Sequence, residues 1–260
     1  MQTKHALLLL PIAAMLFACT GKDSNTEAAK KTDIAWGTAA MYIERPIAQG
    51  DTLCYQIDLK LDTISGDSML AASLNDMLRD SVLYARRPTV QATMAAYADS
   101  IEAEWKAEIA EMYEPEAEFK DMFQYYLTMK GTPMDNGRKD VLSYMVHTEC
   151  YLGGAHGSHD TRFYNFDTES GKLISIDDII PAGRRKEALE AMGEQLCADY
   201  GVATLADLQE QTGITMLGDL YLTNNFFLHD DSITFIFNIY EIAPYACGAI
   251  DVTIPSVPNP

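Results

Sequence analysis

The residues best suited to chemistry gather in one glycine-rich segment, Gly153-Gly154-Ala155-His156-Gly157-Ser158-His159. Three glycines in five positions permit positive φ angles and a close approach of the backbone to another chain segment or a ligand. His147, His156 and His159 could bind a metal or exchange protons, with Asp160 orienting one imidazole. We predict instead a tight strand connection with His156 hydrogen-bonded to backbone, because no carboxylate cluster is evidently paired with these histidines.

A second turn, Pro244-Tyr245-Ala246-Cys247-Gly248-Ala249, precedes the last predicted strand. Tyr240 and Tyr245 there offer aromatic faces with polar tips. If this turn packs beside the glycine-rich one, the two frame a cleft, and we predict a ligand surface made of Tyr151, Gly153, Gly154, His156, His159, Tyr240 and Tyr245. No catalytic residue, metal site or cofactor is predicted, because the sequence has no Gly-x-Ser-x-Gly, His-Glu-x-x-His or phosphate-loop motif.

The N-terminus predicts export. The apolar run from Ala6 to Phe17 follows Lys4 and is too short to span a bilayer, which takes about 20 apolar residues. It therefore indicates a signal peptide, residues 1–18. Leu16-Phe17-Ala18-Cys19 resembles the lipobox of bacterial lipoproteins, in which the cysteine is lipidated, although Phe17 is bulkier than usual. We expect a lipid on Cys19, a tether over residues 19–33, and a body held at a membrane in the cell envelope, outside the cytoplasm; the alternative is an ordinary secretory signal.

The remaining cysteines, Cys54, Cys150, Cys197 and Cys247, leave two alternatives open. In an oxidising envelope they allow three pairings, of which we favour Cys54–Cys150 because both lie on predicted strands. They could equally be small buried hydrophobic residues. Since no Cys-x-x-Cys pair occurs, neither a zinc knuckle nor a thioredoxin-like site is indicated.

The chain is strongly acidic, with 19 Lys and Arg against 38 Asp and Glu and a net charge of −19. Binding to nucleic acid or to anionic lipid headgroups needs clustered basic residues, so neither partner is expected. The charge could attract a basic partner protein or serve solubility alone.

Hydrophobic periodicity predicts an α+β fold, in which antiparallel sheets are covered by helices in two intimately packed subdomains. Helical spacing appears over residues 69–82, after Pro88 as far as Pro115, and over 186–200. Predicted strands cover 52–59, 119–130, 139–151, 162–167, 172–176, 225–228, 232–240 and 249–254.

Three stretches carry a family resemblance: the glycine-rich segment with Tyr151, the 163–180 hairpin, and residues 235–249. Together they resemble the RsiV-like domain, a bacterial family of unknown function, although Cys247 stands where that family more often has Ala. The region from Ile34 to Gly131 is more loosely similar to the PdaC-like domain that usually precedes it. The resemblance implies a PdaC-like region over 34–135 and an RsiV-like domain over 136–260.

The two named relatives suggest an envelope role. The extracellular part of RsiV binds lysozyme, whereas PdaC deacetylates peptidoglycan through a separate domain for which this sequence leaves no room. We therefore expect a non-catalytic, lipid-anchored module that binds or senses a peptidoglycan fragment or a lysozyme-like protein. A hydrolase acting on cell-wall carbohydrate, which would need paired carboxylates, and a structural envelope protein remain the alternatives.

Overall fold

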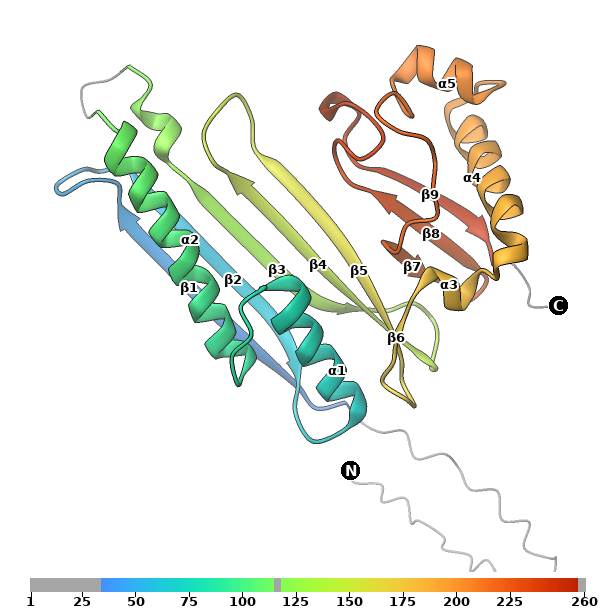
Figure 1. The fold of residues 1–260 in the computed structure, drawn as a ribbon, viewed down its shortest axis with the longest axis horizontal. Helices are drawn as coiled ribbons and strands as arrows, with labels where there is room; N and C mark the ends of the chain where they lie inside the picture. The colour runs from blue at the N-terminus through green and yellow to red at the C-terminus, as the bar shows by residue number, and fades with distance from the viewer. Residues whose placement is uncertain (1–33, 115–117, 257–260) are drawn as a thin grey trace, which may run out of the picture. The chain divides into compact units, whose positions relative to one another are not determined.

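The computed structural model describes residues 34–114 and 118–256; the predicted signal peptide, the tether and Cys19 lie outside the described residues. It contains a six-stranded sheet of order β1-β2-β3-β4-β5-β6 and a three-stranded sheet of order β7-β8-β9 (Figure 1). The strands of the first sheet are β1 (Trp36–Pro46), β2 (Cys54–Ile64), β3 (Tyr126–Met134), β4 (Val141–Tyr151), β5 (Ser158–Asp167) and β6 (Leu173–Ile174). Those of the second are β7 (Phe226–Leu228), β8 (Ser232–Phe237) and β9 (Ile250–Pro255). The predicted α+β class is confirmed.

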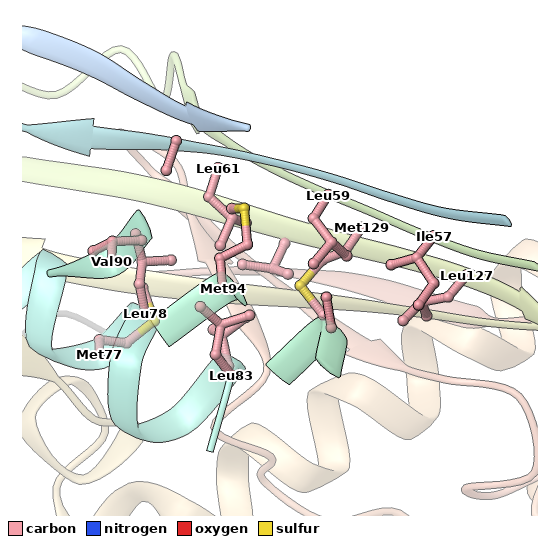
Figure 2. Close-up of a cluster of buried hydrophobic side chains, with 14 of the residues drawn as sticks. Ile57, Leu59, Leu61, Met77, Leu78, Leu83, Val90, Met94, Leu127 and Met129 are labelled. Carbon is pink, nitrogen blue, oxygen red and sulfur yellow. The ribbon is translucent and has the colours of Figure 1, made fainter. Parts of the chain in front are cut away.

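Alternation along β2 decides which face of the first sheet is covered. Tyr55, Ile57, Leu59 and Leu61 are buried, whereas the residues between them are exposed. The covering helices are α1 (Met69–Met77), which continues as a π-helical turn over Leu78–Val82, and α2 (Val90–Met112). Figure 2 shows the apolar side chains of β2 and β3 pointing toward those of the helices.

The helices also set the direction of the next strand. Because α1 and α2 carry the chain back across the sheet, β3 pairs parallel to β2, with Ile57 opposite Leu127. The other strand pairs of both sheets are antiparallel, as predicted.

The strand predicted over 119–130 begins later, because Lys120–Phe123 forms a 3-10 helix that buries Phe123. It also continues beyond the predicted end at residue 130, as far as Met134. Gly131 permits this continuation, since a Cβ there would lie 2.5 Å from the hydroxyl oxygen of Tyr144. The strand β1 and the helix α5 (Leu205–Thr212) were not predicted.

The second sheet packs against its own helices, α3 (Ile176–Ile179), α4 (Arg185–Tyr200) and α5. Met192 and Leu196 of α4 are fully buried in a core with Phe235 and Phe237 of β8. Helical spacing predicts a buried stripe of Leu189, Met192, Leu196 and Tyr200. It is confirmed at its centre, whereas Tyr200 at its end is 46% exposed.

Asparagine side chains join the two sheets along the outer edge of β5. Asn225 accepts a hydrogen bond from Phe163 N–H at 2.9 Å and donates to the Thr161 carbonyl at 2.8 Å. Asn238 accepts from Thr161 N–H at 2.8 Å, and Asn165 of β5 donates to the Phe226 carbonyl at 2.8 Å. These amides satisfy backbone groups that a further strand would otherwise pair.

The expected boundary between residues 135 and 136 falls between β3 and β4, which are paired strands of one sheet. The favoured disulfide is wrong: Cys54 and Cys150 are free and lie on β2 and β4, with β3 between them. Two strand spacings of about 4.8 Å exceed the Cα separation that a disulfide can bridge. Cys197 and Cys247 are also free. Within the described ranges, no helix is long and apolar enough to cross a membrane.

Candidate functional site

The glycine-rich turn connects β4 to β5. Gly153 and Gly154 have φ angles of +81° and +87°, which glycine adopts without steric cost. Tyr151 donates its hydroxyl hydrogen to the Gly154 carbonyl at 3.0 Å, and His156 Nδ1 donates to the Gly157 carbonyl at 3.0 Å. The predicted backbone hydrogen bond of His156 is therefore present, and it places the free lone pair of the neutral ring on Nε2.

The second turn is a short 3-10 helix, Tyr245–Cys247, ended by Gly248 at φ +72°. Its position is fixed from the side of α5, because the Cys247 thiol donates to the Thr212 carbonyl at 3.0 Å. Pro244 also packs closely on Gly213, where a Cβ would lie 3.4 Å from the proline ring.

The structure brings these two turns together. The rings of His156 and Tyr245 stack with their centroids 3.7 Å apart and their planes 18° apart. Tyr245 donates its hydroxyl hydrogen to the Gly157 carbonyl at 3.0 Å, so one carbonyl accepts from both turns. Tyr240 extends the row, with its ring centroid 5.7 Å from that of Tyr245.

Two tyrosines at the end of the first sheet adjoin the glycine-rich turn. Tyr126 and Tyr151 are opposite one another on β3 and β4, and their rings stack at 6.3 Å. A Cβ on Gly157 would lie 3.4 Å from the Tyr126 hydroxyl oxygen, so Tyr126 reaches the same turn. We call the five side chains Tyr126, Tyr151, His156, Tyr240 and Tyr245 the aromatic ledge.

The ledge keeps aromatic surface in contact with solvent. Tyr126 is 38% exposed and Tyr240 is 54% exposed. Tyr240 also has a φ angle of +67°, a left-handed conformation that costs a bulky L-residue about 1–2 kcal/mol. Backbone strain of this kind is concentrated at functional sites.

His159 follows the glycine-rich turn on β5. It is on β5 opposite Glu149, and its ring stacks with that of His147 at 6.5 Å. His147 is in turn held by the Thr161 hydroxyl at 2.7 Å and by Glu149 at 3.1 Å. In the described part of the chain, no group of three or more His, Cys, Asp or Glu side chains could hold a metal ion.

The ledge is thus suited to contact a ligand through ring faces. The hydroxyl groups of Tyr151 and Tyr245 donate to backbone carbonyls. Because His156 donates through Nδ1, its Nε2 can accept a hydrogen bond from a ligand. Tyr126 was not among the residues predicted for the ligand surface. The signal was available in the predicted strand pair, since the register that places Tyr126 opposite Tyr151 extends a candidate residue across the sheet.

The part of the chain that forms the second sheet and its helices also has a recognisable sequence. Residues 177–256 match the DUF3298 family. The model of this family is described as a protein of unknown function, and the matched segment runs from α3 to the end of the described chain, including Tyr240 and Tyr245. The glycine-rich turn precedes the DUF3298 match.

Solved structures extend the likeness over most of the chain. A crystal structure of a DUF3298 family member from Bacteroides fragilis has a TM-score of 0.72 and 25% sequence identity, covering 85% of this chain and 91% of that one. A DUF3298 family protein from Pseudomonas aeruginosa has a TM-score of 0.59 and 18% identity, covering 86% of this chain and 92% of its own, and shows a shared fold. No curated protein matches the sequence significantly.

Proposed function

We propose that this chain is a lipid-anchored binding or sensing module of the cell envelope, and that its aromatic ledge binds a peptidoglycan glycan. The observation that carries the proposal is the stack of His156 on Tyr245, which unites two turns 88 residues apart in sequence. The two turns pack against each other but leave their rings partly exposed. Such an arrangement buries little apolar area in the core and is better suited to contact a ligand.

The chemistry of the ledge favours a sugar ligand. Tyrosine rings present an apolar face beside a polar edge, which matches the alternation of C–H and hydroxyl groups on a pyranose. Tyr126 and Tyr240 are the exposed rings, and His156 Nε2 can accept a hydrogen bond from a sugar hydroxyl. The proposed activity is binding without catalysis.

The location in the envelope is supported by the sequence. Leu16-Phe17-Ala18-Cys19 has the lipobox pattern, and the polar residues after it suit a tether between membrane and body. A lipid on Cys19 would hold the ledge close to the cell wall. Metabolic labelling with an alkyne fatty acid should mark the chain in its bacterial host, and Cys19→Ser should abolish the label; labelling that survives the substitution contradicts the anchor.

The binding test is calorimetric titration of the full chain, carrying Cys19→Ser to avoid lipidation, with muropeptides and with lysozyme at low and moderate salt. We expect saturable, salt-insensitive binding of muropeptides that falls at least tenfold in Tyr240→Ala and in His156→Ala. Tyr84→Ala is the matched control, because Tyr84 is 71% exposed and belongs to neither turn.

Two results would count against the ledge. Muropeptide binding that ignores all three substitutions would place the glycan elsewhere. Salt-sensitive binding of lysozyme alone would instead assign the function to the acidic surface and a basic protein, since screening by salt is the mark of charge-driven association.

A further inference from the structure

A concave groove lies between α4 and α5, with a volume of about 930 Å³. Its lining residues on α4 are Lys186, Leu189, Glu190, Gly193, Glu194, Cys197 and Ala198. Their spacing of three and four residues makes one continuous face of the helix. This face differs from the one that buries Ala188, Met192 and Leu196 in the core.

The groove is elongated. The α4 residues that line it extend from Lys186 to Ala198, and at 1.5 Å of rise per residue this face is about 18 Å long. Such a length corresponds to roughly three turns of a second helix laid alongside. The shape therefore fits a chain segment better than a compact small molecule.

The floor of the groove is apolar. Leu189, Val202 and Leu220 line it while only half-buried, and Leu205 remains 40% exposed. Gly193 lets Leu205 of α5 pack closely on α4, because a Cβ at position 193 would lie 3.2 Å from the Leu205 side chain. An amphipathic segment buries its apolar face in a groove of this kind.

The rim is acidic. Glu190 binds Lys186 at 3.1 Å, whereas Glu194 and Asp219 form no ion pair with any residue in the described ranges. The whole chain carries a net charge of −19, so no long-range field opposes a cationic partner. Charge complementarity thus selects basic side chains beside the apolar face of the occupant.

We propose that this groove is a docking site for an amphipathic helical segment of a partner protein, apolar on one face and rich in Lys or Arg on the others. This site is separate from the aromatic ledge, and binding at one can be tested without the other. The groove therefore gives the module a second function, the recruitment of a basic protein segment.

The test uses two synthetic probes of about 14 residues, one with leucines at helical spacing and lysines elsewhere, the other with glutamates replacing the lysines. Fluorescence anisotropy with the full chain should show binding of the lysine probe that weakens at high salt, and none of the glutamate probe. The double variant Glu194→Lys, Asp219→Lys should lose the lysine probe by at least tenfold and bind the glutamate probe.

Site assignment comes from the groove thiol and a matched apolar pair. The lysine probe should slow maleimide alkylation of Cys197 at least tenfold, followed by peptide mass spectrometry, and leave Cys54 on β2 unchanged. Leu205→Asp should weaken binding at least tenfold, whereas Leu173→Asp, at a position 44% exposed on β6, should not.

The proposal is overturned if both probes bind equally, if Leu205→Asp and Leu173→Asp behave alike, or if the probe protects Cys54 as well as Cys197. Protection of Cys197 that rises with protein concentration alone would assign the groove to a second copy of the chain. Thermal unfolding of each variant establishes that it is folded before binding is measured.

Discussion

At the scale of single residues, two tyrosines hold left-handed backbone conformations, Tyr84 at φ +49° and Tyr240 at φ +67°. Both are largely exposed, so neither conformation is compensated by deep burial of the ring. Tyr240 lies on the ledge and Tyr84 lies in the connection before α2, which makes them a natural pair for separating strain from function.

Replacement of either tyrosine by Asn should stabilise the protein, because Asn tolerates the left-handed region. We expect a gain of about 1 kcal/mol from Tyr240→Asn and from Tyr84→Asn, seen as a rise in Tm of about 2–4 °C by calorimetry. Muropeptide binding should fall only in Tyr240→Asn. Equal binding by the two variants would show that the Tyr240 ring has no part in ligand contact.

Gly171 lies in the β5–β6 hairpin at a close approach to α1. Its φ is +70°, and a Cβ would lie 2.6 Å from the carbonyl carbon of Met69, a backbone atom that cannot move aside. Gly171→Ala should therefore lower the free energy of unfolding by about 2–4 kcal/mol, measured by urea denaturation. Gly50→Ala is the control, since Gly50 has φ +84° with nothing within 4 Å and should lose only about 1 kcal/mol. Similar losses at both positions would mean that the hairpin shifts away from α1.

At the scale of elements, α3 depends on a capping box. Asp178 accepts hydrogen bonds from Ser175 N–H at 2.9 Å and from the Ser175 hydroxyl at 2.6 Å. The ammonium group of Lys172, 2.6 Å away, and the bonds from Ser175 hold the pKa of Asp178 well below its usual range. The charged carboxylate thus fixes both the β6 hairpin and the first turn of α3.

The pH dependence follows from that direction. A carboxyl whose pKa is lowered by folding stabilises the protein above its unfolded pKa of about 3.9, and this stabilisation is lost as the pH falls toward the folded pKa. Asp178→Asn should therefore be less stable than the parent at pH 7, and the difference should shrink below pH 4 in urea denaturation. Asp177→Asn, in the same turn, removes an ion pair with Arg185 without touching the cap. A difference between parent and Asp178→Asn that stays constant with pH would contradict the role of the charge.

Element types were predictable wherever the burial period is clear. The faces of β2 and of α4 follow from alternation and helical spacing, as Ile57 and Met192 illustrate. The strand β1 was missed because it buries only Ala39 fully, and α5 because Leu208 is its single buried residue. A local signal for the start of α5 is present in its N-cap, where the Thr204 hydroxyl accepts a hydrogen bond from Asp207 N–H at 3.1 Å.

The residues of the candidate site could be predicted from the sequence, but whether the two turns lie side by side could not. Sequence reasoning chose both turns and their aromatic residues, but whether they meet depends on contacts that no local pattern encodes. The asparagine contacts that join the second sheet to β5 are of this kind. His159 directly follows the turn in the sequence, and the register of β4 with β5 places it opposite Glu149.

At the scale of the whole molecule, the two sheets are joined by hydrogen bonds that involve side-chain amides. Asn225 makes two of these bonds, to Phe163 N–H and the Thr161 carbonyl, and a third within the second sheet, to the Ile236 carbonyl. Asn225→Leu removes this partner from Phe163 N–H and from the Ile236 carbonyl, and leaves the Thr161 carbonyl only its bond from Asn238. We therefore expect a loss of about 2–4 kcal/mol in the free energy of unfolding. The control is Asn224→Leu, because the exposed Asn224 accepts one hydrogen bond among the described residues, from Ile176 N–H. This variant should lose about 1 kcal/mol of the free energy of unfolding in the same urea titration. Equal losses would show that the sheets are held by apolar packing instead.

The asparagines along β5 also decide what the protein does when it meets copies of itself. An uncovered strand edge is a template onto which another extended chain can add, and such additions propagate into aggregates. An amide side chain offers one donor group and one acceptor in nearly the geometry of a peptide unit, yet it ends there and presents no further strand. Asn225 and Asn238 therefore close the edge at Thr161 and Phe163 without continuing the sheet. A chain crowded at high local density would benefit from an edge that is chemically satisfied and sterically finished.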